Sequence, residues 1–368
     1  MRIVFVVRAV NKLGGTERAT IDQANLLAEN TGHEVHLVSL YNDVIGNVKI
    51  SPYISDKIKY HCVHNKLKLL QFGSLIHRVI DLASSRLLSK ILKKINPELC
   101  VFTAIRDFRP IYTRYFKCIL MVHFSYKEFL AGHYTRCKFN KCNSLFHKVV
   151  FLSSEDANQY IRETNAVNGL AINNYCRIES IIRTSYKNKK IIYVGRLDEN
   201  QKKLSHAINI IKILVDSDVF EGWVFDIYGS GHSELALKKL VELNKLSEFI
   251  KFKGLSNNIS EVYNNADIAI LTSDFEGLPL FLIEASLKGL PIVSYNSSPG
   301  INTIVIDNEN GYVVKKNDMK DFALKLTKLI LNDELRSEMG KKSNKHAVRF
   351  FSKEAILKDW KKMIENYD

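Results

Sequence analysis

The stretch DIAILTSDFEGLPLFLIEASLKGLPIVSYN, residues 267–296, decides the fold. It opens with DIAILTS, a short apolar run of the kind that fills a buried strand. A Gly-Leu-Pro turn follows, and then PLFLIEASLKG, whose apolar residues fit a helix. The segment closes on PIVSYN, a second apolar strand. A strand, a helix and another strand in succession predict a parallel βαβ unit.

The same alternation runs through the rest of the chain. In the N-terminal half, strands are predicted at RIVFVV, HEVHLVSLY, LCVFTAI, KCILMVH and KVVFLSS, with a helix at ATIDQANLLAEN. The pattern restarts near residue 190 with the strand KIIYVGRL and the helix SHAINIIKILVDS. Continuous apolar strands are typical of parallel sheets covered on both faces. The predicted fold class is therefore α/β, with doubly wound, Rossmann-like parallel sheets.

The length and the break in the pattern predict two domains. A chain of 368 residues is too long for one ordinary core. The polar run RTSYKNKK separates the two alternating patterns, so we expect a first domain over residues 1–186 and a second over residues 187–350. A C-terminal helix is expected within residues 351–368. Two such sheets facing across a cleft would form a ligand site at their strand ends.

The composition, with 46% hydrophobic and 25% charged residues, is that of a soluble globular protein. No apolar run reaches the roughly 18 residues of a membrane-spanning helix. The apolar part of MRIVFVVRAVNKLGG is short and contains Arg8, which fits a buried strand better than a signal peptide. We therefore expect a cytoplasmic protein.

Positive charge is concentrated in the first half of the chain. Residues 1–186 contain 26 Lys and Arg against 14 Asp and Glu, whereas residues 187–368 contain 27 against 25. This asymmetry predicts an anionic partner. Residues 65–97 mix Lys and Arg with Leu, Ile and Phe, so they form either a surface for an anionic membrane or an ordinary amphipathic core helix with a basic outer face. In the first case the protein is peripheral on the inner face of the cell membrane.

The six cysteines are too sparse for a disulfide framework. One group, His133, Cys137, Cys142 and His147, has the residue types of a zinc site, but its Cys-to-His spacing is too short for a finger loop. We expect no metal and no other cofactor.

Two glycine turns follow predicted strands. Gly14 and Gly15, in LGGTER, let the backbone approach a ligand closely and precede a helix N-terminus, which favours a phosphate. Gly229, in YGSG, makes a second close-approach turn. Either turn can also be explained by chain geometry alone, because strand-to-helix turns often need glycine.

Two cations follow the first strand of the second half. In VGRLDENQKK, the side chains of Arg196 and of Lys202 or Lys203 would extend from the end of the strand into the expected cleft. Two fixed cations there can neutralise a diphosphate leaving group. The alternative is a solvated loop.

Two carboxylates lie in the opening stretch. Glu276 lies in the turn, and Gly277, Leu278 and Pro279 are expected to start the helix, where their backbone can meet an anion or sugar hydroxyls. Glu284 lies about two helical turns further on, too far for direct pairing. The two carboxylates would then contact different parts of one extended ligand. Alternatively, Glu276 only favours the helix dipole, but Glu284 has apolar neighbours and so needs a partner.

GGTER, VGRLDENQKK and FEGLPLFLIEASLKGLPIV, in this order and spacing, resemble the retaining glycosyltransferases of family 4, which have the GT-B fold. The resemblance covers essentially the whole chain and is strongest over residues 190–330. It is closest to bacterial enzymes that build surface or lipid-linked glycans. It implies that the C-terminal helix crosses back to the first domain.

The resemblance also implies residue roles. Glu276 would contact the donor sugar near the reacting centre, and Glu284 the nucleotide ribose. Arg196 and Lys202, with Lys203 as the alternative, would hold the diphosphate. The roles in the first half concern His123 in MVHFS, which would face the donor sugar, and Gly14 and Gly15, which would pack near the diphosphate.

The function expected from these observations is a retaining transfer of a hexose or N-acetylhexosamine from a nucleotide-sugar, expected to be a UDP-sugar, to a hydroxyl of a growing, lipid-linked cell-surface glycan. One alternative enzyme class is a GT-B sugar-nucleotide epimerase or a phosphorylase. An alternative of another class is a basic nucleic-acid-binding protein, suggested by the net charge of +14. No recognised nucleic-acid module is present in the sequence, so no nucleic acid partner is expected.

Overall fold

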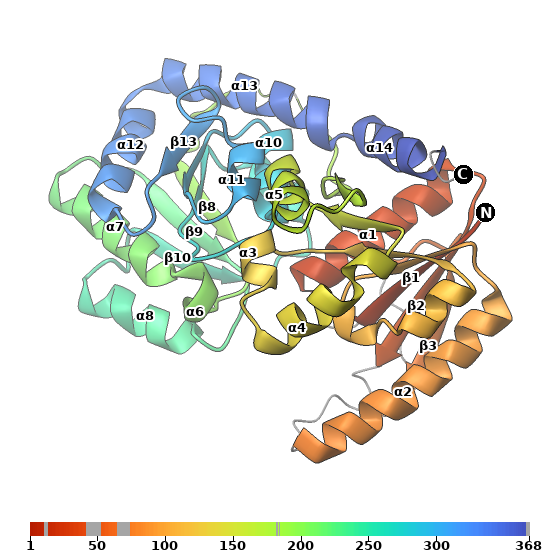
Figure 1. Ribbon diagram of the computed structural model, residues 1–368. Coiled ribbons are helices and arrows are strands. Elements are labelled where there is room, and N and C mark those ends of the chain that lie inside the picture. The colour runs from red at the N-terminus through yellow and green to blue at the C-terminus, as the bar shows by residue number, and fades with distance from the viewer. Residues whose placement is uncertain (11–13, 42–52, 65–73, 182, 184, 366–368) are drawn as a thin grey trace. The chain divides into compact units, whose positions relative to one another are not determined.

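The computed structural model describes residues 1–10, 14–41, 53–64, 74–181, 183 and 185–365, with the backbone alone for residues 64 and 74–82. These residues form two compact units (Figure 1). The first comprises Met1–Cys176 with Lys353–Asp368, and the second comprises Arg177–Ser352. The basic segment 65–97 of the sequence analysis lies partly outside the described residues.

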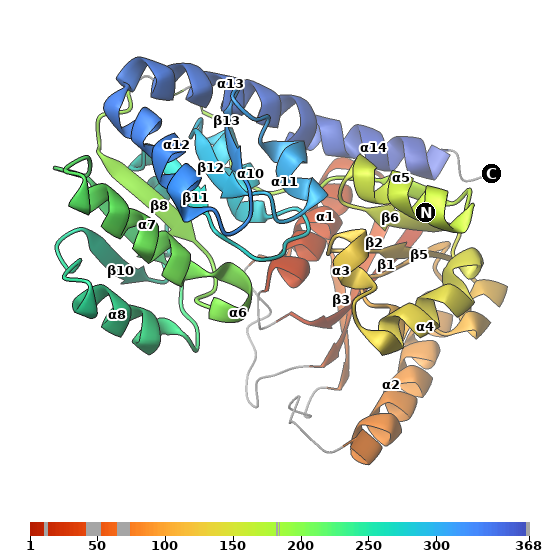
Figure 2. The same cartoon turned by 60° about the vertical axis from the view of Figure 1, so that its left-hand side comes forward.

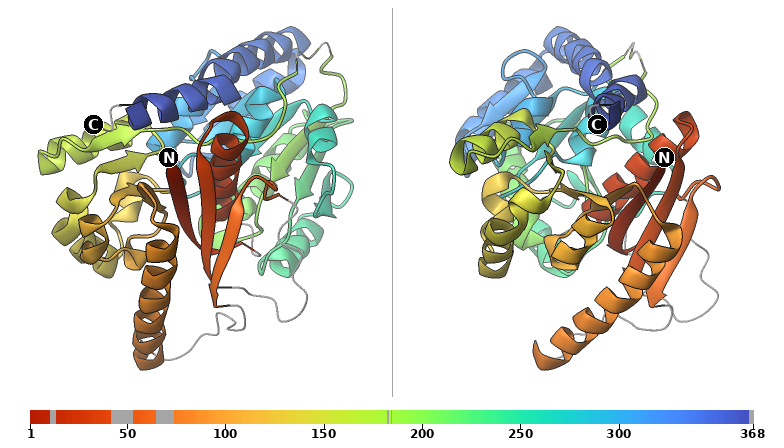
Figure 3. Two further views of the ribbon diagram at one scale, coloured as in Figure 1. Left: turned by 90° about the vertical axis from the view of Figure 1, so that its right-hand side faces the viewer. Right: turned by 45° about the vertical axis from the view of Figure 1, so that its right-hand side comes forward.

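The first unit is built on a seven-stranded parallel sheet in the order β3-β2-β1-β4-β5-β6-β7. Its strands β1, β2 and β3 lie side by side (Figure 3). The strands are β1 (Arg2–Ala9), β2 (Glu34–Tyr41), β3 (Lys59–His64), β4 (Leu99–Phe102), β5 (Lys117–Met121), β6 (Lys148–Phe151) and β7 (Gly169–Ala171). The apolar side chains of the central strands are fully buried, which is why these strands read as continuous apolar runs.

Helices surround this sheet. They are α1 (Gly15–Asn30), α2 (Ser74–Ile95), α3 (Tyr126–Phe129), α4 (His133–Cys142), α5 (Ser154–Thr164) and α14 (Lys353–Glu365), with the 3₁₀ turns η1 (Ile105–Asp107), η2 (Pro110–Arg114) and η3 (Asn143–Leu145). Within the core the Phe102 ring stacks on Tyr112, and Phe108 meets both rings edge-on, which anchors the segment that follows β4.

The second unit repeats the architecture with a six-stranded parallel sheet in the order β10-β9-β8-β11-β12-β13. The strands are β8 (Lys190–Val194), β9 (Val224–Tyr228), β10 (Ile250–Gly254), β11 (Ile268–Leu271), β12 (Ile292–Tyr295) and β13 (Gly311–Val314). Both sheets have the order 3-2-1-4 at their centre, so the direction of the crossovers changes beside the first strand of each. The predicted doubly wound parallel sheets are confirmed.

The helices of the second unit divide between the two faces of its sheet. They are α6 (Glu199–Lys202), α7 (Leu204–Asp216), α8 (Glu234–Leu243), α9 (Ile259–Asn264), α10 (Leu280–Leu287), α11 (Pro299–Ile304), α12 (Met319–Leu331) and α13 (Asp333–Phe351). Helix α7 contacts α8 and α12, whereas α10 contacts α11 and α13 (Figure 2). The apolar patterns did not predict α13, nor β3 and β7 of the first unit.

The structure divides the chain after Cys176, earlier than the expected boundary at residue 186. The reason is that Arg183 and Tyr186 are buried in the second unit. The Arg183 guanidinium donates to the carbonyl oxygens of Tyr263 and Ala266, and the Tyr186 hydroxyl donates to the Gly289 carbonyl at 2.8 Å. The polar run that suggested a linker therefore contributes to the core of that unit.

The C-terminal residues belong to the first unit. Trp360 of α14 is fully buried, lies edge-on to Phe5 of β1, and donates its indole N–H to the side chain of Gln23 on α1. Of the helices in the described residues, none is long and apolar enough to span a membrane.

Candidate functional site

In the second unit, β8 ends at Val194 and leads into the loop that carries Arg196. The Tyr193 hydroxyl donates to the Arg196 carbonyl at 2.8 Å, which fixes the backbone while the side chain remains exposed. Asp198 then caps the four-residue helix α6, whose last residue is Lys202. Arg196 and Lys202 thus emerge from one short segment at a strand end.

The Lys202 ammonium meets Glu276, which follows β11. Its Nζ donates to the Glu276 Oε1 at 2.6 Å, and the two side chains are only 15% and 7% exposed. The pair forms because β8 and β11 are neighbours in the sheet, so the loops after them meet at the point where the strand order reverses. Lys203 instead adopts a left-handed conformation (φ 47°), and its carbonyl accepts from Thr272. The structure therefore places Lys202 rather than Lys203 against Glu276.

Gln201 connects Arg196 to the loop of Glu276. Its side-chain oxygen accepts from the Arg196 guanidinium at 3.1 Å, and its side-chain nitrogen donates to the Phe275 carbonyl at 3.2 Å. Its own carbonyl accepts from the Asp274 N–H at 2.7 Å. Gln201 is buried, so these three bonds hold the two loops in a fixed arrangement.

The residues Gly277, Leu278 and Pro279 precede helix α10 and do not start it, which corrects the sequence-based boundary. The helix begins at Leu280, and Pro279 is its N-cap with ψ 117°. The Gly277 carbonyl accepts from the Ser298 hydroxyl at 2.9 Å, and a Cβ at Gly300 would lie 1.9 Å from that same carbonyl. The turn is thus packed against the start of α11.

Glu284 lies inside α10 and is 1% exposed. The Tyr263 hydroxyl of α9 donates to its carboxylate, and the Tyr263 ring stacks on Phe281. The inference that a carboxylate with apolar neighbours has a partner is confirmed.

Gly229 makes a close approach after β9. A Cβ at this position would lie 1.9 Å from the carbonyl oxygen of Gly195, and its φ of 128° is strained for any other residue. Only glycine allows the loops after β8 and β9 to pack this closely.

The remaining predicted residues belong to the first unit. His123 follows β5, is buried, and has its Nε2 3.3 Å from the Thr20 hydroxyl of α1. Burial lowers the pKa of His123 to about 4, so the ring is neutral at pH 7. Gly14 is the N-cap of α1, and Gly15 is its exposed first residue, where an added Cβ would meet no atom within 4 Å.

The cysteine and histidine group does not come together as a metal site. His133 Nε2 lies 3.5 Å from the Cys137 Sγ on helix α4, while Cys142 is buried in the core. In the part of the chain that the structure describes, no group of three or more His, Cys, Asp or Glu side chains is placed to hold a metal ion.

Arg196, Lys202 and Glu276 thus form one cluster, joined by Gln201. No role was predicted from the sequence for Gln201 or for Ser298. The Ser-Pro-Gly turn after the strand PIVSYN was the available signal, because a strand-to-helix turn there returns to the same edge of the sheet.

Comparison with known proteins then decides the family. Residues 177–346 match the family model described as Glycosyl transferases group 1. The match begins at the first residue of the second unit and covers nearly all of it. The second unit is a glycosyl transferases group 1 domain.

Relatives extend the similarity of this glycosyltransferase chain to its full length. It is 27% identical over 376 residues to an uncharacterized glycosyltransferase of Haemophilus influenzae, with 99% of each chain covered. It is also 27% identical to the GalNAc-α-(1→4)-GalNAc-α-(1→3)-diNAcBac-PP-undecaprenol α-1,4-N-acetyl-D-galactosaminyltransferase of Campylobacter jejuni, covering 99% of this chain and 98% of that one.

A solved structure confirms the fold. The complex of a TarM mutant from Staphylococcus aureus with fondaparinux, α-GlcNAc-glycerol and UDP superimposes with a TM-score of 0.81 at 16% identity, covering 98% of this chain and 99% of that chain. The predicted GT-B fold of the glycosyltransferase is therefore confirmed, together with its two parallel α/β sheets.

Proposed function

We propose that this glycosyltransferase moves a hexose or an N-acetylhexosamine from a UDP-sugar to a hydroxyl of a growing, lipid-linked cell-surface glycan, with retention of anomeric configuration. The observation that carries the proposal is the partly buried Lys202–Glu276 pair at the reversal point of the group 1 domain. It places a cation and a carboxylate together where doubly wound sheets bind ligands.

The donor assignment is supported by the charge of the cluster. Arg196 and Lys202 provide two cations for a diphosphate, whose oxygens match a guanidinium fork and an ammonium point charge. Glu276 would accept hydrogen bonds from the sugar hydroxyls, and the backbone of Gly277, Leu278 and Pro279 would line the same region. The solved TarM complex contains UDP, which supports UDP as the nucleotide.

Glu284 is proposed to contact the ribose. A helical side chain leans toward the N-terminus of its helix, here toward the turn at Gly277–Pro279. Its bond to Tyr263 would fix the carboxylate, so that a ribose hydroxyl meets an already oriented acceptor. Gly229 would keep the neighbouring loop close to the nucleotide.

The proposed reaction is a front-face displacement. The bond between the anomeric carbon and the diphosphate oxygen breaks, and its electron pair leaves with the diphosphate. Arg196 and Lys202 stabilise this charge, which makes a metal or another cofactor unnecessary in the proposal. The acceptor oxygen attacks the same face of the sugar, and its proton passes to a diphosphate oxygen. His123, neutral because of its lowered pKa, is assigned to hydrogen bonding with the donor sugar, and Gly14 and Gly15 to the diphosphate.

The lipid-linked acceptor and a peripheral position on the inner membrane face are supported by two observations. The Campylobacter jejuni relative is named for an undecaprenol-linked substrate. The C-terminal half of α2 exposes Lys90 and Lys93, and η2 with the residue after it exposes Ile111, Arg114 and Tyr115. The Lys93 ammonium lies 5.1 Å from the centre of the Tyr115 ring. Basic residues with exposed apolar side chains suit an anionic bilayer surface.

Two measurements test the function. Nucleotide sugars are screened for thermal stabilisation of the full chain, and the best donor is then combined with membrane extracts to detect transfer. Glu276→Ala should abolish transfer and keep the circular dichroism spectrum, because the carboxylate is proposed to contact the sugar. Full transfer by that variant would refute the assignment. Consumption of the donor without an acceptor would instead indicate an epimerase, and a pyridoxal phosphate absorbance would indicate a phosphorylase.

A further inference from the structure

A hollow in the first unit lies where the direction of the crossovers changes. It is lined by Leu40 at the end of β2, by Ser84 and Ser85 of α2, and by Arg106 and Arg109 of the segment after β4. The strand order β3-β2-β1-β4 puts the carboxyl ends of β2 and β4 on either side of β1. Ligands of doubly wound sheets bind at such a point, so the position itself favours a binding site.

The side chains that line this hollow carry a net positive charge. Arg106 and Arg109 line it together with one carboxylate, Asp107. Arg8 of β1 approaches the same carboxylate, with its Nη1 3.6 Å from the Asp107 Oδ1. This Nη1 is buried and makes no hydrogen bond among the described residues. Three guanidinium groups therefore lie at or beside a hollow that one carboxylate lines, and a bound anion would reduce their mutual repulsion.

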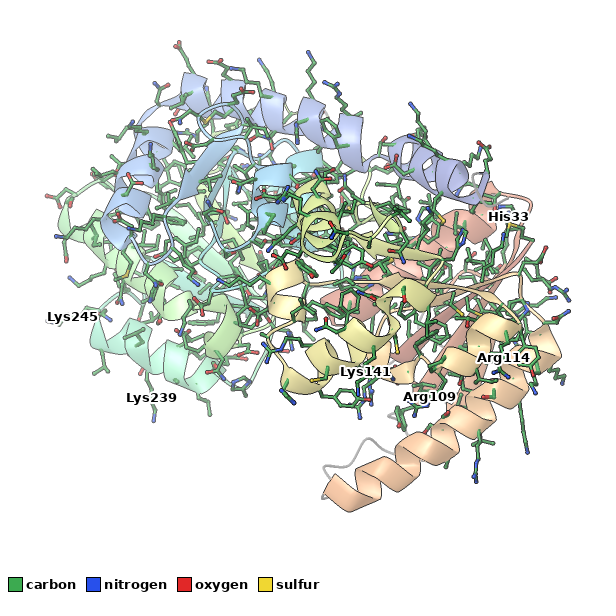
Figure 4. All side chains as sticks on the ribbon, viewed as in Figure 1. His33, Arg109, Arg114, Lys141, Lys239 and Lys245 are labelled. Atoms are coloured by element: carbon green, nitrogen blue, oxygen red, sulfur yellow. The ribbon has the colours of Figure 1, made fainter. Side chains whose placement is uncertain are left out.

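The Arg109 side chain and the backbone of this segment are held in place by hydrogen bonds. Arg109 donates from Nε to the Ser85 hydroxyl at 3.2 Å and from Nη1 to the Arg106 carbonyl at 3.3 Å (Figure 4). Lys138 of α4 donates to the carbonyls of Arg106 and Phe108 at 3.0 and 2.9 Å. Burial, with a further contribution from the Arg109 charge, lowers the pKa of Lys138 to about 8. The Arg109 guanidinium is thus ordered before any ligand arrives, which reduces the entropy cost of binding one.

We propose that this hollow binds a phosphoryl group of the acceptor substrate. The inference rests on the proposed glycosyltransferase function. Arginine forks and serine hydroxyls, here those of Arg106, Arg109 and Ser84, are the donors that phosphate oxygens prefer. The hollow is small and open to solvent at its mouth, which suits a single phosphoryl group better than a whole nucleotide. The cations proposed for the donor diphosphate, Arg196 and Lys202, belong to the second unit, whereas the arginines of this hollow belong to the first.

The test uses inorganic phosphate as the probe and the full chain carrying Arg196→Gln, which weakens phosphate binding at the proposed donor site. Phosphate should raise the thermal midpoint of this protein more than acetate does at equal ionic strength. Adding Arg106→Gln and Arg109→Gln should weaken the apparent affinity about tenfold or more, because two charge-assisted contacts are lost. The matched control, Arg136→Gln with Lys141→Gln, removes two exposed cations from the same unit and should leave the affinity unchanged; Lys141 is labelled in Figure 4. Equal stabilisation by acetate, or an equal loss in both double variants, would overturn the inference.

A second comparison separates this inference from the proposed function. With Arg196 restored, the R106Q/R109Q protein should bind UDP as the unaltered chain does, and its KM for phosphate-bearing lipid acceptors in a membrane extract should rise about tenfold with kcat retained. If the unaltered chain binds no UDP-sugar, the proposed function fails, while the phosphate titration still decides the hollow. A loss of UDP affinity in R106Q/R109Q would assign these arginines to the donor and overturn the acceptor site.

Discussion

Removing the Lys202–Glu276 pair tests whether it is a functional unit or a structural ion pair. In Lys202→Met the Glu276 carboxylate, 7% exposed, loses its cation, and in Glu276→Gln the Lys202 ammonium keeps only a neutral acceptor. Breaking a fully buried pair costs about 3–5 kcal/mol, and exposed pairs contribute about 0–1 kcal/mol. Because Lys202 is 15% exposed, we expect about 2 kcal/mol for Lys202→Met, about 1 kcal/mol for Glu276→Gln, and a coupling energy of about 1–2 kcal/mol in the double variant.

The same variants should separate activity from stability. If both groups act on the donor, each single variant should lower kcat by about 10²–10³, which corresponds to about 2.7–4 kcal/mol of transition-state stabilisation. The double variant should be no more active than the worse single variant, because the two groups act as a unit. Stability is measured by urea unfolding, followed through tryptophan fluorescence, to which the buried Trp223 of the second unit contributes, and activity by release of the nucleotide.

The matched control is the surface pair Lys238–Glu234, whose side chains are 45% and 29% exposed. Lys238→Met with Glu234→Gln should change stability by less than about 0.5 kcal/mol and leave transfer unaltered. The reasoning is refuted if the Lys202→Met/Glu276→Gln protein retains activity within about threefold of the unaltered chain, since the expected loss is at least about a hundredfold.

Three further changes have predictable outcomes. Gly229→Ala places a Cβ 1.9 Å from a backbone oxygen, so it should lower the free energy of unfolding by about 2–3 kcal/mol and weaken donor binding. Gly254→Ala, whose Cβ meets nothing within 4 Å, should lower the free energy of unfolding by only about 1 kcal/mol. Urea unfolding and donor titration compare the two variants. The pKa of His123 is lowered from 6.5 to about 4, so between these pH values the unfolded chain binds more protons than the folded chain. The free energy of unfolding should therefore decrease as the pH falls from about 6.5 toward 4, by up to about 1.4 kcal/mol per pH unit. His123→Gln should flatten this pH dependence in unfolding curves recorded at several pH values. Arg183→Met removes a buried guanidinium with four carbonyl partners and should destabilise the second unit by at least about 3 kcal/mol, while Lys251→Met at an exposed site should leave the melting temperature within about 1 °C.

The strands of both sheets could be predicted because a strand buried on two faces needs a continuous apolar run in the sequence. RIVFVV and DIAILTS illustrate this, since β1 and β11 are central strands with buried neighbours on each side. Strand β3 escaped prediction for the opposite reason. It is an edge strand, and in KYHCVH the polar residues Lys59, His61 and His64 interrupt the apolar ones. Helix α13 was missed because its 19 residues are mostly polar.

The boundary near residue 176 and the role of Gln201 could not be predicted, because both depend on contacts between distant residues. Arg183 lies in a polar run that resembles a linker, yet its guanidinium binds carbonyls about a hundred positions away in the chain. Gln201 makes its bonds to Arg196 and to Phe275, and only the adjacency of β8 and β11 brings these together. Contacts between residues far apart in the chain produce no pattern in the local sequence.

The pairing of Lys202 with Glu276 has a consequence for the order of events at the proposed donor site. A diphosphate must compete with Glu276 for the Lys202 ammonium, and the competition costs part of the binding energy. The Glu276 side chain is only 7% exposed, so a carboxylate that loses this cation needs new hydrogen-bond donors, and sugar hydroxyls provide them. Diphosphate and sugar should therefore bind cooperatively. A nucleoside diphosphate alone displaces the Lys202 ammonium but provides no hydrogen-bond donor for Glu276. The complete nucleotide-sugar should therefore bind more tightly than the nucleoside diphosphate, by more free energy than the sugar contacts alone contribute. Gln201 limits the movement to the two side chains, because its bonds keep both loops in place while the partners exchange.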